Sequence, residues 1–334
     1  MSGQSFKSFK KRQNRLLLEA TLKPLQGTLF TPANYPNTGP VIYSHNGVDE
    51  LIVEFFAKMA NACERPCLDA SERGLLPLLE GVSYAEARNR EDDTFKTTTL
   101  QESHRLASRY FREAIMEDGT LFKDYFNQLC DVKKGNLLDK KLFYATLFRC
   151  DAFALLHGIM MAQYDAQMQV TRVLSARIEA HNAQLVSVGG AKVNTLDMQG
   201  KNGDGNVPYT KEYGQGDLRA YFNIDLHLLR SFQLPEEANE MLFALALWKI
   251  RMVLEEGLRL RSECDLGVVG ELQCTNMDFQ VPSLEELEES LPGLIKQCAP
   301  YMNGRTVLYY TTPIITTTPK KTDENGEQKQ DEEE

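Results

Sequence analysis

Two stretches of alternating residues enclose a long polar segment between Arg172 and Arg230. In the first stretch, residues 172–182 (RVLSARIEAHN), apolar side chains alternate with polar ones, and residues 219–229 repeat the pattern. This period of two predicts a pair of half-buried strands. The roughly thirty residues between them far exceed the loop of an ordinary hairpin. We therefore expect an extended hairpin whose polar connection, a finger at about residues 183–215, contacts a partner.

The finger combines glycines with lysines. Gly189 and Gly190 permit positive φ angles and let another backbone approach closely, while Lys192, Lys201 and Lys211 supply positive charge. A surface insertion without a function is the alternative interpretation of the same composition.

The length and composition of the chain bound its organisation. With 334 residues, of which 42% are hydrophobic, the chain can bury a large core, and its length alone suggests about two domains. No linker rich in proline or serine interrupts residues 15–300, so one elaborated domain fits the sequence equally well. We assign a basic N-terminal extension to residues 1–14, a single domain to residues 15–318 and a disordered acidic tail to residues 319–334.

The cysteines and the apolar runs predict a cytoplasmic protein that is not in a membrane. The seven cysteines show no paired spacing, and no apolar segment opens the chain, which favours a reducing compartment. The longest apolar run, Met241–Trp248, is too short to cross a bilayer.

Periodicity and capping signals predict a mixed α+β fold. The expected elements are a strand at Arg15–Leu22, helices at Asp49–Cys63 and Lys140–Phe148, a buried strand at Ala152–Met161, a helix from Pro235 to about Arg261, a helix at Leu284–Cys298 and a strand at Thr306–Thr312. Their order is compatible with a βαββαβ ferredoxin-like core that carries large helical insertions.

Charge is distributed unevenly along the chain. The net charge is −10, yet residues 1–15 contain five basic residues and no acidic one. Residues 172–219 contain six basic and five acidic residues. A track that binds phosphates is therefore possible at the hairpin, with the acidic helical part facing elsewhere.

The sequence contains none of the catalytic motifs that we tested. It has no G-x-S-x-G elbow, and Gly200-Lys201 lacks the flanking residues of a phosphate-binding P-loop. Cys63 and Cys67 have no second cysteine pair or histidine beside them, so we expect no metal and no cofactor. His157 fits a core position better than a general base, whereas His181 lies on a polar strand face where it could stack on RNA or face solvent.

Several segments, in order, resemble one known family. They are RLLLEATLKPLQGTLFTP at Arg15, LLHG at Leu155, VLSARIEAHN at Val173, GGAKVN at Gly189, GNVPY at Gly205, AYFNIDLHLLRSFQLP at Ala220, ALALWKI at Ala244 and GLRLRSECDL at Gly257. Over roughly residues 14 to 270 the chain is similar to the backbone subunit (Cas-seven type) of type I-G, formerly I-U, CRISPR Cascade effector complexes. The resemblance implies membership of the repeat-associated RNA-binding superfamily, with a modified RRM core and a long β-hairpin thumb.

The resemblance also implies a non-enzymatic role. Such subunits polymerise along one CRISPR RNA, contact the other Cascade subunits and meet the target DNA strand through the guide RNA, whose base pairing reads the sequence. We expect RNA contacts from the finger, its flanking strands and the segment beyond the long helix: Lys192, Lys201, Arg172, Arg177, Arg219, Arg259, Arg261, Gly189 and Gly190. For any single arginine, an ion pair with a nearby acid is the competing explanation.

Two other functions remain open from the sequence. An RNA-processing endoribonuclease of the same superfamily would use a histidine such as His157 or His181 as its general base. A protein-only scaffold would copurify with no RNA.

Overall fold

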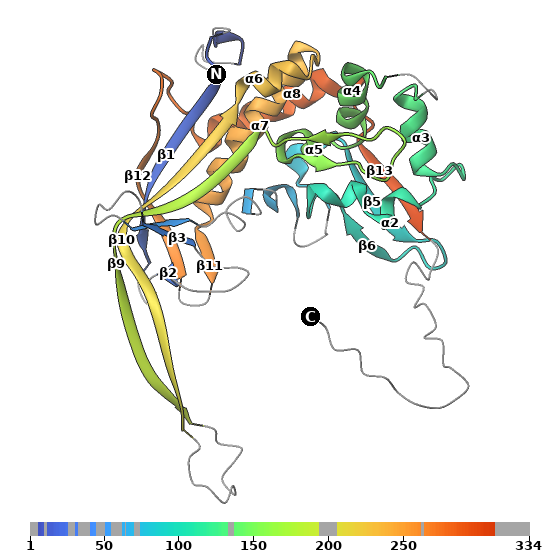
Figure 1. Ribbon diagram of the computed structural model, residues 1–334. Coiled ribbons are helices and arrows are strands. Elements are labelled where there is room, and N and C mark those ends of the chain that lie inside the picture. The colour runs from blue at the N-terminus through green and yellow to red at the C-terminus, as the bar shows by residue number, and fades with distance from the viewer. Residues whose placement is uncertain are drawn as a thin grey trace, which may run out of the picture.

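The computed structural model describes residues 6–9, 12–25, 31–32, 41–44, 51–54, 62–63, 65–69, 74–132, 137–193, 206–261 and 264–310. A six-stranded antiparallel sheet forms one side of the molecule (Figure 1). Helices α7 (Glu236–Glu255) and α8 (Leu284–Cys298) lie behind one face of this sheet. The described α-helices all lie on this side, and we call the opposite face of the sheet the open face.

Strand β1 (Arg15–Pro24) lies at the centre of the sheet. It pairs antiparallel with β10 (Asn206–Asp225) and β12 (Cys264–Cys274), and β10 pairs in turn with β9 (Leu174–Val193). The spatial order β12-β1-β10-β9, with helices between β1 and β9 and between β10 and β12, is that of a βαββαβ ferredoxin-like core. The α+β, RRM-like prediction is confirmed.

Shorter elements complete the described part of the chain. Strands β11 (Leu258–Arg261) and β2 (Thr31–Pro32) extend the main sheet at its edges. A second sheet joins β13 (Arg305–Tyr310), β5 (Tyr84–Asn89) and β6 (Phe95–Thr98). Two small pairs are β3 (Val41–Ser44) with β4 (Leu51–Glu54), and β7 (Ile159–Met160) with β8 (Gln169–Val170).

Ten further helical elements are described, and half of them lie between β6 and β9 in the sequence. The α-helices are α2 (Arg109–Arg112), α3 (Phe122–Leu129), α4 (Lys140–Cys150), α5 (Phe153–His157) and α6 (Leu226–Ser231). The 3-10 turns are η1 (Phe6–Ser8), η2 (Arg65–Cys67), η3 (Pro77–Leu79), η4 (Ser103–Ala107) and η5 (Ala299–Tyr301). The predicted helix at Lys140–Phe148 is confirmed as α4.

Helix α7 is buried along most of its length because it packs between the sheet and α8. Pro235 caps its start, and Glu236 and Glu237 follow in the first turn, where they complement the helix dipole. Gly257, with φ of 83°, follows its last turn. The prediction that this helix reaches about Arg261 is wrong, because the chain turns at Gly257 and enters β11.

Helix α8 confirms the predicted bounds Leu284–Cys298. Ser283 and Glu286 form a reciprocal capping box at its start. Leu287, Leu291 and Ile295 then recur on one face and are buried. Local capping and helical periodicity agree here, so this helix is readable from the sequence.

The predicted loop at about residues 183–215 is mostly strand. Strands β9 and β10 are each 20 residues long and pair continuously from Leu174 to Val193, apart from one irregularity near Asp217. The second predicted strand also ends earlier than residue 229. The Asp225 side chain accepts a hydrogen bond from the backbone nitrogen of Leu228 at 2.8 Å, which starts α6.

Two further predictions of secondary structure are wrong. Within Ala152–Met161, residues Phe153–His157 form helix α5, whose first nitrogen donates to the Asp151 side chain, and only Ile159–Met160 form a strand. A short apolar run that is buried on all sides gives no periodicity to separate helix from strand. Within Asp49–Cys63, Leu51–Glu54 form β4, because they pair with β3 and lie against β9.

No helix in the described part of the chain is long and apolar enough to cross a membrane.

Candidate nucleic-acid interface

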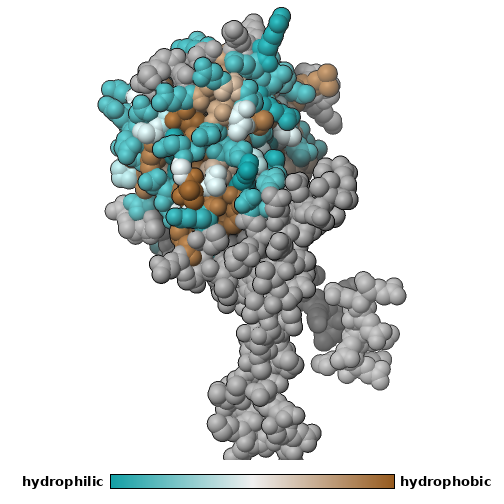
Figure 2. All heavy atoms as spheres, turned by 90° about the vertical axis from the view of Figure 1, so that its left-hand side faces the viewer, coloured by the Kyte–Doolittle hydropathy of each residue, from teal (hydrophilic) through white to brown (hydrophobic). Residues whose placement is uncertain are grey.

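The sheet presents one apolar face and one polar face. Leu18 of β1, Phe222 of β10 and Ile178 of β9 are buried on the face that meets the helices. The residues between them point to the open side, where Glu19, Tyr221 and Arg177 lie opposite one another across three strands. Figure 2 shows the molecule from this side, where hydrophobic residues are scattered among hydrophilic ones.

A polar cluster lies on β9 and β10 of the open face. The Arg177 guanidinium is paired with the Glu179 carboxylate and lies 4.9 Å from the centre of the Tyr221 ring. His181 Nε2 lies 3.1 Å from the Tyr221 hydroxyl and 3.2 Å from Glu179 Oε2. Burial, followed by the Glu19 and Glu179 carboxylates, raises the pKa of Tyr221. The phenol therefore stays protonated and can donate a hydrogen bond at neutral pH.

Arg219 is held by an acidic residue of the next strand. Its Nη1 donates to Oε1 of Glu19 at 3.0 Å, and this carboxylate raises the pKa of Arg219. Of the three arginines predicted on the flanking strands, Arg177 and Arg219 therefore lie on the open face, but each already has a carboxylate partner. A phosphate would have to compete with Glu179 and Glu19 for them.

The glycines and one lysine of the finger lie on the part of the hairpin that projects from the sheet. Strand β1 pairs only with Leu218–Asp225 of β10, so the preceding strand residues continue beyond it for about 40 Å at about 3.3 Å per residue. Figure 1 shows this ribbon extending well below the body. Gly189, Gly190 and Lys192 lie on it, opposite Thr210, Tyr209 and Val207. Lys201 lies outside the described residues.

The base of this ribbon is braced on two sides. Strand β2 pairs with β10 at Tyr213 and Gly214, and β4 lies against β9. Beyond these contacts the ribbon consists of two strands, which alone are only marginally stable in water.

The remaining predicted arginines lie apart from the finger. Arg259 and Arg261 are on β11, at the edge of the sheet opposite to β9. Arg172 precedes β9 and is exposed at the end of the sheet remote from the ribbon. The structure thus separates the predicted residues into a ribbon group, an open-face group, a β11 group and Arg172.

Sequence reasoning missed Glu19 as a member of the open face. Glu19 lies on a strand whose alternation was recognised, yet its partner Arg219 is 200 residues away in the sequence. Only the register of β1 against β10 brings them together, and spacing along the chain carries no signal of that register.

A second group of ionisable residues is enclosed in the core behind the sheet. Lys249 Nζ lies 2.8 Å from His157 Nε2 and 4.6 Å from the centre of the Phe153 ring, and its residue is completely buried. Burial, reinforced by Lys249, lowers the pKa of His157 well below its ordinary value. Burial raises the pKa of the neighbouring Asp151 to about 7. His157 is thus a core histidine, out of contact with the open face.

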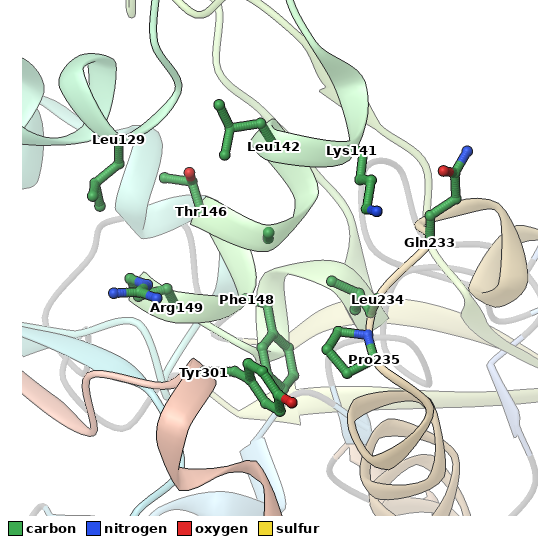
Figure 3. Close-up of a pocket in the computed structure, with 11 residues that line it drawn as sticks. Leu129, Lys141, Leu142, Thr146, Phe148, Arg149, Gln233, Leu234, Pro235 and Tyr301 are labelled. Atoms are coloured by element: carbon green, nitrogen blue, oxygen red, sulfur yellow. The ribbon is translucent and has the colours of Figure 1, made fainter.

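The helical side carries a cavity of about 380 Å³ between α4, the start of α7 and η5 (Figure 3). Phe148, Leu234 and Tyr301 provide apolar walls, and Lys141 and Arg149 also line it. No group of three or more His, Cys, Asp or Glu side chains within the described ranges is arranged to hold a metal ion.

Comparisons with known proteins place the chain in a family. No curated protein sequence matches it. Among solved structures, a chain of one described as "CRISPR RNA-guided surveillance complex, pre-nicking" is similar over 72% of this chain and 71% of that chain, with 13% identity and a TM-score of 0.36. The family model described as "CRISPR-associated protein GSU0053" matches residues 16–185, which is 170 of the 334 residues. The chain therefore belongs to the CRISPR-associated protein GSU0053 family.

Proposed function

We propose that the protein is a non-catalytic CRISPR RNA-binding backbone subunit of a type I-G Cascade complex. Several copies would polymerise along one guide RNA, which pairs with the target DNA strand, and other Cascade subunits would complete the complex. Family membership supports a role in CRISPR defence.

The observation that carries the proposal is the β9–β10 ribbon. Past its pairing with β2 the two-stranded ribbon continues through residues 206–212 of β10, about 23 Å, and two strands alone gain little stability. Gly189 and Gly190 lie next to each other on it, and glycine lets a nucleic-acid backbone approach closely. A thumb laid across RNA is the use that fits this shape and composition.

The open face supports binding without reading of the RNA sequence. Tyr221 and His181 offer rings for stacking, while Arg177 and Arg219 are already paired with carboxylates. Stacking on an aromatic ring tolerates any base, and guide pairing supplies specificity instead.

The experiment is a titration of purified protein with single-stranded RNA at several salt concentrations. Lys192→Glu should weaken binding and lower the slope of log K against log salt by roughly 0.7 for one lost phosphate contact. Lys296→Glu, an exposed change of the same charge on α8, is the control and should leave the slope unchanged. Equal slopes for Lys192→Glu and the wild type would show that Lys192 does not contact an RNA phosphate. A wild-type protein that neither binds RNA nor copurifies with it would refute the backbone role.

One observation favours the endoribonuclease as second candidate. His181 lies within 3.1 Å of the Tyr221 hydroxyl on the open face, so a general acid and base stand side by side. Cleavage of repeat RNA that is lost in His181→Ala but kept in His227→Ala would establish this activity. His157 is not the general base in this second candidate function, since it is 4% exposed and hydrogen-bonded to Lys249.

A further inference from the structure

The basic N-terminal segment is docked onto the body through a buried carboxylate. The Glu240 side chain on α7 accepts hydrogen bonds from the backbone nitrogens of Phe6 at 2.9 Å and Lys7 at 2.8 Å. Glu240 is 6% exposed and Phe6 is 7% exposed. A buried carboxylate that meets backbone amides fixes the path of the chain, because leaving it unpaired there would cost free energy.

Aromatic packing and a second set of hydrogen bonds fix the rest of the segment. Phe9 packs between Phe243 and Phe279, with both ring-centre distances at 5.3 Å. Further along, the Gln13 carbonyl accepts from Arg230 at 2.9 Å and the Asn14 carbonyl accepts from the His227 backbone nitrogen at 3.1 Å. The segment is therefore anchored on both sides of Arg12 before it enters β1 at Arg15.

This docking brings the backbones of three arginines to one end of the sheet. Arg15 lies opposite Asp225 on the neighbouring strand, and the Asp225 nitrogen donates to the Val173 carbonyl at 2.9 Å, so Arg172 follows one strand further on. At about 4.8 Å between neighbouring strands, the backbones of Arg15 and Arg172 lie about 10 Å apart. Arg12, Arg15 and Arg172 are all exposed.

These three arginines differ from those of the open face in their partners. Arg177 and Arg219 are paired with Glu179 and Glu19. Among the residues that the structure describes, none forms an ion pair with Arg12, Arg15 or Arg172. The nearest acidic residue in the register, Asp225, uses its carboxylate to cap α6. Guanidinium groups that pair with none of the described carboxylates are more available to phosphate than those already held by one.

We propose that Arg12, Arg15 and Arg172 form a second site for the phosphates of a single-stranded nucleic acid, at the end of the sheet remote from the ribbon (Figure 1). The docked N-terminal segment holds Arg12 in this site. The inference rests on the proposed nucleic-acid function and adds to it a place and a set of residues. Guide RNA and target DNA offer the same phosphate chemistry.

The test measures salt-dependent binding of the full-length chain to labelled RNA and DNA single strands of one sequence. Arg12→Glu with Arg15→Glu should lower the slope of log K against log salt by about 1.4, for two lost contacts at about 0.7 each. Arg90→Glu with Lys296→Glu makes the same change in net charge at exposed positions elsewhere and should leave the slope unchanged. A lower slope with RNA alone assigns the site to the guide, and a lower slope with DNA alone assigns it to the target strand.

Two results would overturn the site. If the wild type binds RNA normally and both double variants share its slope, the second site is wrong while the RNA-binding function stands. If the wild type binds neither strand, the proposed function fails as well.

A second measurement tests the docking. In the double variant Phe6→Ala with Phe9→Ala, trypsin should cleave after Arg12 faster than in the wild type, as measured by mass spectrometry. The slope of log K against log salt should also fall, although every arginine is retained. Unchanged cleavage and an unchanged slope would show that the segment does not position Arg12.

Discussion

Replacing Asp151 with asparagine should change how the stability of the protein depends on pH. Asp151 is completely buried between α4 and α5, and its Oδ1 accepts a hydrogen bond from the Phe153 nitrogen at 3.1 Å. Its Oδ2 has no hydrogen-bond partner among the described residues. Burial raises the pKa of this carboxyl from 3.8 to about 7, against the opposing effects of hydrogen bonds and of Lys249.

The magnitude follows from the difference between the folded and unfolded pKa. Between pH 3.8 and about 7 the unfolded chain loses the proton that the folded chain keeps, so the free energy of unfolding falls as pH rises. A difference of about three units at about 1.4 kcal/mol each gives about 4 kcal/mol over this window. The stabilisation is complete below the unfolded pKa and is lost once pH passes the folded pKa.

The measurement is urea unfolding at a series of pH values between 4 and 8, followed by the fluorescence of Trp248. This is the only tryptophan of the chain and it is fully buried. Asp151→Asn should gain about 4 kcal/mol relative to the wild type between pH 4 and 7. His157 is present in both proteins, so most of its contribution cancels when the variant is compared with the wild type. Its lowered pKa acts in the opposite direction to that of Asp151, because it lowers the free energy of unfolding as pH falls.

Asp118→Asn is the matched control. Hydrogen bonds from Thr120 lower the pKa of this exposed carboxyl, so its difference from the wild type should be flat over the same window. A flat curve for Asp151→Asn would refute the reasoning. It would mean that Asp151 is ionised in the folded protein and pairs with Lys249.

Three further predictions concern local structure. Gly158→Ala should lower the free energy of unfolding by about 2 kcal/mol or more and lower the melting temperature, because Gly158 has φ of 79° and an added Cβ would lie 2.7 Å from the Val170 carbonyl oxygen. Gly293→Ala is the control: inside α8 an added Cβ meets nothing within 4 Å, so this change should stabilise the protein by about 0.5–1 kcal/mol. Ser283→Ala removes the capping box of α8 and should cost about 1 kcal/mol in urea unfolding, and Ser290→Ala on the same helix should cost less. A thiol reagent should label Cys274 before Cys130 or Cys298, since these two are buried and burial raises their pKa to about 11 and about 12; rapid labelling of Cys130 in the folded protein would contradict the packing.

The sequence predicts those parts of the fold in which local signals and tertiary packing agree. The alternation at Arg15–Leu22 and the helical periodicity at Leu284–Cys298 each identify an element that the structure contains. The segment Leu51–Glu54 was misassigned because its strand pairing with β3 is a tertiary contact. The run Ala152–Met161 is buried on nearly every side, so hydrophobicity could not distinguish its helix from a strand.

The candidate site is less predictable than the fold. That Arg219 points to the open face follows from strand alternation, but its pairing with Glu19 depends on a register between strands far apart in the chain. The docking of Phe6 on Glu240 likewise joins residues 234 apart in sequence. Composition revealed the positive charge of the N-terminal segment, whereas its position depended on these long-range contacts.

The central position of β1 governs how the protein can fold during synthesis. Leu18 pairs with Phe222 and with Cys274, so the first strand made must wait for the last strands of its sheet. At about 5–20 residues per second, the ribosome needs about 12–50 s to add the roughly 250 residues in between. For the first roughly 200 of these residues β1 has neither neighbour, and a fragment that stops at residue 185 would never acquire them. Slower folding than its size suggests, and a need for protection from aggregation while nascent, follow from the topology of the sheet.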